Sequence, residues 1–267
     1  MSKVKIYTYS HNRPDFIKLQ HETIKRHVKN DYEFIVFNNE RPGGDGGFDE
    51  SKIGEISNIC KEIGVKCIRV ELDPELQHLN GVKMFDGNSY TNGNNACAYS
   101  FTWGWKNYIV KNKCLSIIID SDMFFIKDID LIDEMKDYNF AFVPSYRYHE
   151  QYKSPENPGK IAFKYPWNGI IFAKPHELPN PKEISWGCGY VNNIATDVGG
   201  EVYYYLEKYK DQIKERYIDQ WGVLVDIEPP FEVNYSGCGQ MFANFDKGEV
   251  EIRDYQESNL RTFPHQT

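Results

Sequence analysis

The sequence lacks the features that several large classes of protein require. Its six cysteines include no Cys-x-x-Cys pair, and no run approaches the roughly 20 apolar residues of a membrane-spanning helix. The N-terminal residues, MSKVKIYTYS, contain no apolar stretch of the kind found in a signal peptide. We therefore expect free thiols, no membrane span and a cytoplasmic location.

The sequence also lacks blocks of Lys and Arg. With 31 basic and 39 acidic residues the net charge is −8, which argues against a nucleic acid as a partner and against an anionic lipid surface. A phosphorylated ligand would be repelled by this chain unless a cation or oriented backbone N–H groups neutralised it locally.

What is present is typical of a globular protein. The 267 residues are 40% hydrophobic and 26% charged, with no repeat, linker or low-complexity tract, which predicts one domain. Aromatic residues reach 15%. Most will pack in the core, although exposed aromatic rings also suit the C–H faces of sugars.

Strand and helix patterns alternate through the first half of the chain. Apolar or β-rich runs predict strands, and apolar residues at helical spacing predict the helices between them. The expected strands are residues 4–9, 32–37, 65–70, 115–119, 140–143 and 170–172. The first expected helix begins at Pro14, and three further helices are expected at residues 53–63, 96–111 and 201–210. This order predicts an α/β fold with a mostly parallel, doubly wound sheet, in which ligands bind beyond the carboxyl ends of the strands.

Asp120 and Asp122 follow the apolar run LSIII, where a buried strand is expected to leave the sheet. Two carboxylates separated by one residue can face a single hard cation, and Mn²⁺ or Mg²⁺ prefers such oxygen ligands together with substrate phosphates. The competing interpretation is a polar turn that closes the strand.

A second triplet of the same form, Asp128-Ile129-Asp130, shows that the spacing alone is weak evidence. We interpret it as the acidic first turn of a helix, where carboxylates favour the helix dipole without any metal. Its position, away from a buried strand, separates it from the first triplet.

The Asp-Ser-Asp triplet after an apolar strand, together with the first-strand segment from Tyr7 to Pro14 (YTYSHNRP), resembles the GT-A-fold glycosyltransferases. It particularly resembles the small transferases of large algal viruses and marine phages, which would place the protein in a host cytoplasm. The resemblance covers roughly residues 1–175. It implies a nucleotide-sugar-binding half, 1–125, and a mixed acceptor-binding half, 126–267.

The resemblance also implies functional residues. Asp120 and Asp122 would hold the metal, with Asp120 also near the donor. The nucleotide pocket would include Thr8, Tyr9, Ser10, His11, Arg13, Asn38 and Asn39. A simple helix start is the alternative for Asn12, whereas the guanidinium of Arg13 suits phosphate oxygens.

In the second half, Trp167 and Asn168 would contact the donor sugar and acceptor, unless Asn168-Gly169 is a hairpin turn. Asp197 is the candidate catalytic base, with a helix N-cap as its alternative role and Glu201 as the alternative base. His265 would complete the metal site, unless it belongs to a disordered tail.

These features together predict a metal-dependent hexosyl- or pentosyltransferase. It would move a sugar from a UDP- or GDP-sugar to the hydroxyl of a glycan or glycoside, with inversion. A non-catalytic sugar or sugar-nucleotide binding module is the alternative. A nucleotidyltransferase would need a glycine-rich loop where Ser10-His11-Asn12-Arg13 stands. The sequence does not give the sugar, the base, the acceptor or the oligomeric state.

Overall fold

A computed structural model describes most of the chain. The described residues are 3–11, 13–40, 54–71, 83–84, 88–89, 93–148, 161–218, 224–225, 253–256 and 259–262. His265 and Asn12 lie outside them.

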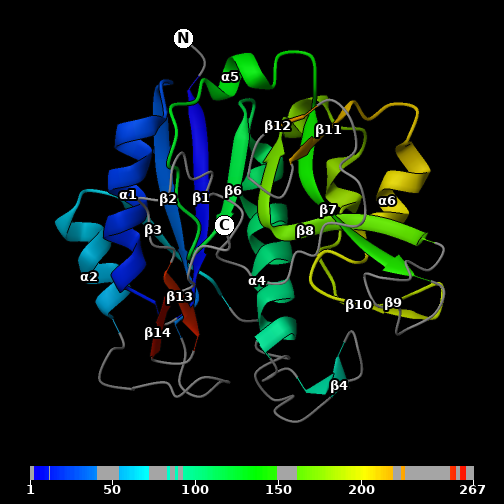
Figure 1. The fold of residues 1–267 in the computed structure, drawn as a ribbon, viewed down its shortest axis with the longest axis horizontal. Helices are drawn as coiled ribbons and strands as arrows, with labels where there is room; N and C mark the ends of the chain where they lie inside the picture. Colours follow the sequence, from blue (N-terminus) through cyan, green and yellow to red (C-terminus); the bar gives the residue numbers. More distant parts are fainter. Residues whose placement is uncertain are drawn as a thin grey trace.

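An eight-stranded sheet forms the centre of the molecule, in the order β12-β11-β7-β8-β6-β1-β2-β3 (Figure 1). The strands are β1 (Val4–Ser10), β2 (Tyr32–Asn38), β3 (Lys66–Arg69), β6 (Ser116–Asp120), β7 (Phe140–Tyr148), β8 (Ile161–Ala173), β11 (Glu215–Ile218) and β12 (Leu224–Val225). Strands β3, β2, β1 and β6 are mutually parallel, and β8 runs antiparallel between β6 and β7. The expected α/β class with a mostly parallel sheet is confirmed.

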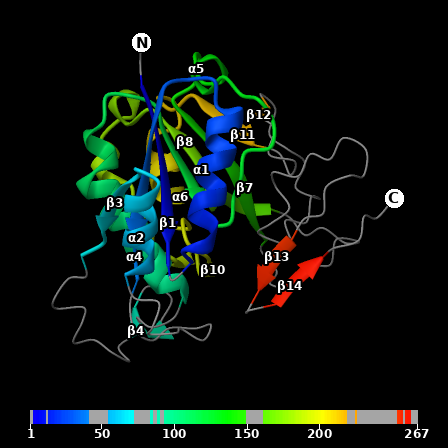
Figure 2. The ribbon, with the colours of Figure 1, turned by 90° about the vertical axis from the view of Figure 1, so that its left-hand side faces the viewer.

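Helices cover both faces of the sheet because the buried side chains of its strands alternate between two cores. The helices are α1 (Asp15–His27), α2 (Glu55–Glu62), α4 (Gly93–Asn107), α5 (Leu131–Glu134) and α6 (Val202–Tyr209). Ile6 and Ile117 pack with α1 and α2, whereas Tyr7 and Ile118 pack with α4 and α6. The same arrangement is seen from the side in Figure 2.

Short elements complete the described chain. They are the 3₁₀ turns η2 (Ile109–Lys111), η3 (Pro175–Glu177) and η4 (Pro181–Glu183), and the two-stranded pairs β4 (Lys83–Met84) with β5 (Asn88–Ser89), β9 (Gly189–Val191) with β10 (Ile194–Thr196), and β13 (Arg253–Gln256) with β14 (Asn259–Thr262). No helix in the described part of the chain is long and apolar enough to cross a membrane. All five cysteines whose side chains are described are free thiols.

Strand β8 differs most from expectation. It begins at Ile161, nine residues before the predicted start at residue 170, and it includes Asn168 and Gly169. The interpretation of Asn168-Gly169 as a hairpin turn is therefore wrong. Pairing with β7 before this stretch and with β6 and β7 after it holds both of its ends in the sheet, despite its proline, asparagine and glycine.

The second acidic triplet serves helix α5. The Asp130 side chain is the N-cap and accepts a hydrogen bond from the Asp133 N–H, while Asp128 pairs with His27 at 3.1 Å. The triplet therefore precedes α5 and is not its first turn, whose acidic residues are Asp133 and Glu134; the helix start itself was predicted correctly.

Candidate functional site

The carboxyl ends of three parallel strands meet at one edge of the sheet. Tyr9 on β1 is in register with Asp120 on β6, and Ser10 is in register with Asn38 on β2. The last residues of β1, β2 and β6 therefore lie side by side. This is the edge at which open α/β sheets bind ligands.

Asp120 is the last residue of β6 and Asp122 lies in the turn that follows it, and both residues are partly exposed. The pKa of Asp120 is raised to about 7, mainly by burial of the carboxyl and to a lesser extent by repulsion from Asp122. The hydrogen bond from the Ser121 N–H lowers the pKa by a smaller amount. Two carboxylates that disfavour each other's charge at a strand end form a site that fits a divalent cation.

The described residues contain no group of three or more His, Cys, Asp or Glu side chains able to hold a metal ion. Among the described residues the candidate site therefore contains two acids, a donor set that suits Mn²⁺ or Mg²⁺ when further oxygen ligands come from substrate phosphates and water.

Gln20 on α1 holds the turn between the two acids. Its side chain is fully buried, and its Nε2 donates to the carbonyl oxygens of Asp120 (2.7 Å) and Met123 (3.0 Å). The residues Asp120–Met123 are thus fixed at both ends from a neighbouring helix. Gln20 could not be predicted from the sequence, because nothing in its local pattern marks a residue whose side chain bonds to a residue 100 positions away.

The first-strand candidates divide between core and edge. Thr8 and Ser10 have fully buried side chains, and the Tyr9 ring stacks between Phe37 and Phe101 at centroid distances of 4.8 and 4.1 Å. Partly exposed His11 donates a hydrogen bond from Nδ1 to the Asn39 carbonyl oxygen at 2.9 Å. Of these side chains, His11 is the one placed to meet a ligand.

Arg13 is partly exposed at the start of α1, and its carbonyl oxygen accepts a hydrogen bond from the Ser10 hydroxyl at 3.1 Å. Pro14 is the N-cap residue, so α1 begins one position after the predicted start. Arg13 therefore lies between the end of β1 and the N terminus of α1, two residues after His11.

Asn38 is the centre of a hydrogen-bond network at the end of β2. Its Nδ2 donates to Glu40 Oε2 (2.9 Å) and Ser57 Oγ (3.1 Å), and its Oδ1 accepts from the Glu40 N–H (2.8 Å) and Arg69 Nη1 (3.0 Å). Glu40 Oε1 also accepts the Ile56 N–H at 3.0 Å, near the N terminus of α2. Asn38 and the 5% exposed Asn39 thus support the edge from within the protein.

A β-bulge brings the β8 candidates toward the acids. Between the pairs Phe142–Ile171 and Pro144–Pro166, β7 has one residue and β8 has four. Ile170 pairs with Ile119, so the bulged residues lie beside the turn that carries the acids. The bulge is a feature that sequence analysis missed.

Within the bulge the two candidates face different surroundings. Trp167 is partly buried against the core of α1 and α2, and its ring lies 1.7 Å from the position that a Cβ on Gly169 would take. Asn168 is 8% exposed and donates through Nδ2 to Cys97 Sγ on α4 at 3.8 Å. Glycine at position 169 is therefore required by the close approach of the indole.

Asp197 follows β10 and is partly exposed. Its N–H donates to the Tyr165 hydroxyl at 3.2 Å, and its Oδ1 accepts the Val198 N–H at 2.7 Å. Helix α6 begins at Val202 with Glu201 as the N-cap residue, so the interpretation of Asp197 as its N-cap is wrong.

Val198 packs with Cys97, the cysteine that contacts Asn168. The segment that carries Asp197 is therefore joined to the bulge through α4.

Glu201, the alternative base, is engaged in a local contact. Its Oε2 accepts from the Ser185 hydroxyl at 2.5 Å, and its carboxylate lies 2.4 Å from the position that a Cβ on Gly187 would take. Gly187 therefore leaves the space in which this carboxylate sits, which favours a structural role for Glu201.

No protein-family description and no curated protein matches this chain. Solved structures do match it. The galactosyltransferase LgtC, in complex with donor and acceptor sugar analogues, is 13% identical with a TM-score of 0.39, covering 81% of this chain and 73% of its own.

Glucosyl-3-phosphoglycerate synthase from Mycobacterium tuberculosis, in complex with Mn²⁺, UDP and glucosyl-3-phosphoglycerate, is 12% identical with a TM-score of 0.40, covering 98% of this chain and 88% of its own. The mannosyltransferase Ktr4p from S. cerevisiae is 15% identical with a TM-score of 0.39, covering 68% of this chain and 58% of its own. At this level of identity and superposition, the activity of the present chain rests on its own site.

Proposed function

We propose that this protein is a metal-dependent glycosyltransferase that moves a sugar from a UDP- or GDP-sugar to a carbohydrate hydroxyl, with inversion. The observation that supports this most directly is the pair Asp120 and Asp122 at the carboxyl end of β6, held by Gln20 and bordered by the β8 bulge. An acidic pair at the ligand-binding edge of an acidic protein suits a cation with a diphosphate.

Asp120 and Asp122 would hold Mn²⁺ or Mg²⁺, and the bound cation would neutralise the diphosphate and so stabilise it as a leaving group. His11 and Arg13 at the end of β1 are the candidates for contact with phosphate oxygens. Helix α4 begins at this edge, as the contact between Cys97 and Asn168 shows, and the positive end of its dipole favours an anionic ligand there.

Asp197 is proposed as the base that takes the proton of the acceptor hydroxyl as that oxygen attacks the sugar. Its backbone is fixed by the Tyr165 hydroxyl, and its side chain is partly exposed. Glu201 is less suited, since the Ser185 hydroxyl and the Gly187 backbone already surround its carboxylate.

The two acidic triplets provide a matched test of the metal site. Asp122→Asn removes one charged metal ligand, so the Mn²⁺-dependent affinity for UDP or GDP should fall by more than about tenfold, or 1.4 kcal/mol. Asp128→Asn alters the second triplet, whose carboxylate pairs with His27, and should leave that affinity unchanged. Titration calorimetry with and without Mn²⁺ measures both. Equal affinities in wild type and Asp122→Asn would contradict the proposal.

Asp197→Asn separates transfer from binding. Loss of a general base should lower kcat by roughly 10²–10⁴-fold while leaving the affinity for the nucleotide and Mn²⁺ unchanged. Glu201→Gln is the comparison variant and should retain more activity. The measurement is release of nucleoside diphosphate in the presence of a sugar acceptor. Full activity of Asp197→Asn would remove the proposed base, and donor binding without any transfer in wild type would indicate a binding module.

A further inference from the structure

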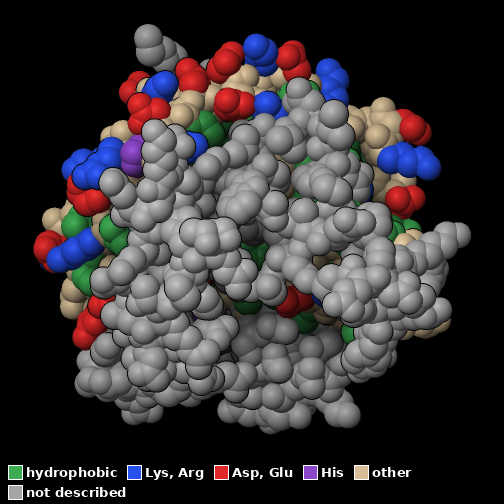
Figure 3. Space-filling view, in the orientation of Figure 1, with side chains coloured by type: hydrophobic (Ala, Val, Ile, Leu, Met, Phe, Trp, Pro, Cys, Tyr) green, Lys and Arg blue, Asp and Glu red, His purple; other side chains and the backbone are tan. Residues whose placement is uncertain are grey.

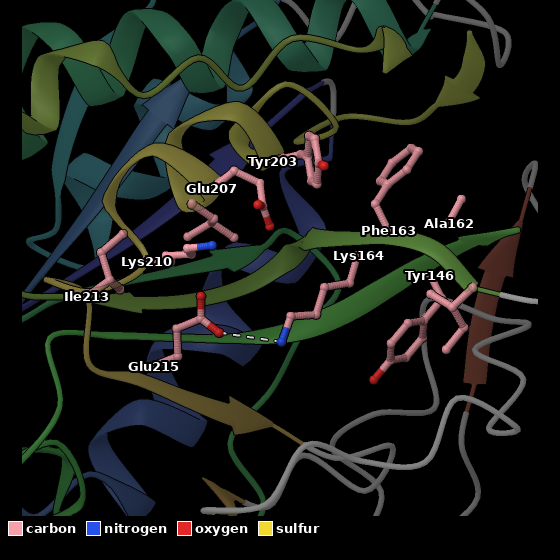
Figure 4. A pocket seen from close by; sticks show the side chains of 11 residues that line it. Tyr146, Ala162, Phe163, Lys164, Tyr203, Glu207, Lys210, Ile213 and Glu215 are labelled. Atoms are coloured by element: carbon pink, nitrogen blue, oxygen red, sulfur yellow. Dashed lines mark ion pairs between the residues drawn. The ribbon is translucent and has the colours of Figure 1, made fainter. Parts of the chain in front are cut away.

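A cavity of about 460 Å³ lies between strands β7, β8 and β11 and helix α6 (Figure 4). Its volume falls in the range of roughly 300–1,000 Å³ that is typical of small-ligand pockets. Its walls come from elements other than those that carry Asp120 and Asp122, so it is a separate feature from the proposed metal site.

Three aromatic side chains border the cavity: Tyr146 on β7, Phe163 on β8 and Tyr203 on α6 (Figure 4). The rings of Phe163 and Tyr203 are 5.0 Å apart, centroid to centroid. Phe163 is buried, whereas both tyrosines are partly exposed. Rings with an apolar face and a hydroxyl at the rim suit a ligand that has apolar C–H faces and polar edges.

The charged side chains of the cavity balance one another. Lys164 pairs with Glu215 at 3.5 Å and donates to the Tyr217 hydroxyl at 2.6 Å, while Glu207 and Lys210 extend from α6 toward the strands (Figure 4). Two lysines and two glutamates give no net charge, so nothing in the lining selects an anion. Ammonium donors and carboxylate acceptors together match the hydroxyl groups of a neutral saccharide.

A chain of contacts through two aromatic residues of β8 connects this cavity to the proposed base. The Phe163 ring lies 6.3 Å from that of Tyr165, centroid to centroid, and the Tyr165 hydroxyl accepts the N–H of Asp197. Both rings project from the same side of β8, since they are separated by one residue. Tyr165 is fully buried, so this contact joins the wall of the cavity to the backbone of Asp197 within the protein.

We propose that this cavity is a subsite for a neutral saccharide, where it holds a sugar unit of an oligosaccharide acceptor away from the reacting hydroxyl. The role of this site in binding an acceptor rests on the proposed function, whereas saccharide binding at the site rests on the lining of the cavity alone. A longer neutral acceptor should accordingly bind more tightly than a monosaccharide, because its distal unit would contact the aromatic rings that border the cavity.

The test begins with an array of neutral di- to tetrasaccharides and continues with calorimetric titration of the saccharide that binds best. Tyr203→Leu removes one of the aromatic rings that border the cavity. Glu207→Gln removes one carboxylate oxygen that could accept a hydrogen bond, and it leaves the core unchanged. Each should weaken binding at least tenfold. Tyr204→Leu is the matched control, since Tyr204 is the next residue on α6, is 51% exposed and does not line the cavity. Absence of neutral-saccharide binding, or unchanged affinity in both variants, would overturn the proposal.

A parallel titration with UDP or GDP and Mn²⁺ separates this proposal from the proposed function. Tyr203→Leu and Glu207→Gln should keep wild-type affinity for the nucleotide. Nucleotide binding without saccharide binding in wild type overturns the subsite and leaves the transferase. Saccharide binding that the variants weaken, in a protein that binds no nucleotide, supports the cavity and rejects the transferase.

Discussion

Gln20, on α1, bonds through its side-chain amide to the turn that carries the acid pair. Its amide donates to the backbone on both sides of Ser121 and Asp122 from within the core. Replacement by Met keeps the volume but leaves two carbonyl oxygens without this donor. Gln20→Met should lower the free energy of unfolding by roughly 1–3 kcal/mol.

Metal affinity distinguishes a positioning role from a structural one. In Gln20→Met, the affinity of the folded protein for Mn²⁺ with nucleotide should fall, because the turn is no longer held. A loss of unfolding free energy alone would leave the affinity of the folded protein unchanged. Thr23→Val, one turn further along α1, removes a bond to the Gln20 carbonyl oxygen and should leave metal affinity unchanged. Urea unfolding and calorimetry measure the two quantities. Wild-type metal affinity in a destabilised Gln20→Met would mean that Gln20 serves the fold alone.

At the scale of residues, the sequence indicates which charged residues could bind a ligand better than it indicates which residues form hydrogen bonds with them. Asp120 and Asp122 can be found because a buried strand leads into them, and strand order places Asp120 and Asn38 at the carboxyl ends of their strands. The partners of these residues, Gln20 and Arg69, come from elements distant in sequence, and their bonds depend on side-chain packing that periodicity does not describe.

At the scale of elements, the bulge in β8 is the feature that brings Trp167 and Asn168 to the sheet edge. A Cβ at position 169 would overlap the Trp167 ring, so Gly169→Ala must displace the indole. Overpacking of this kind costs roughly 1–3 kcal/mol of unfolding free energy. In Trp167→Ala the ring is gone, and the same Gly169→Ala change should cost much less.

A double-mutant cycle of Trp167→Ala and Gly169→Ala therefore isolates the contact. We expect a coupling free energy of about 1–3 kcal/mol, measured by urea unfolding of the four proteins. Tryptophan fluorescence of Gly169→Ala reports the displaced ring. Additive effects of the two substitutions would show that the indole does not lie on Gly169.

The elements that were predicted correctly are those whose pattern is local. Strands β1, β2 and β6 are apolar runs covered on both faces, and α1 and α2 have apolar residues at helical spacing. Strand β8 could not be predicted in full, because Pro166, Asn168 and Gly169 disfavour a strand locally. Its extended form comes from the ladder with β7 before the bulge and the ladders with β6 and β7 after it.

At the scale of the whole molecule, the division into a donor half and an acceptor half stays a prediction, although one core spans both. Phe101 of α4 and Trp186, from either side of the proposed boundary, pack with ring centroids 5.8 Å apart. The acceptor-side helix α6 belongs to the same core. Changes in one half are therefore expected to affect the stability of the other.

Net charge provides the last prediction. The chain carries −8, and acidic and basic side chains are interspersed along the visible coloured rim of Figure 3. A nucleoside diphosphate should therefore bind weakly without a cation and tightly with Mn²⁺. At a ligand concentration of 100 times Kd, binding adds about 2.7 kcal/mol to the unfolding free energy, which is a rise in Tm of roughly 5–10 °C for a chain of this size.

Thermal unfolding with UDP or GDP, each with Mn²⁺ or with EDTA, measures this linkage directly. The larger rise with one nucleotide identifies the base of the donor, because the cation and diphosphate are common to both. Mn²⁺ with inorganic phosphate is the control for a general effect of ions, and Asp122→Asn should abolish the nucleotide-dependent rise. An equal rise in EDTA would show that the protein binds nucleotides without the cation, in which case Asp120 and Asp122 would not form a metal site.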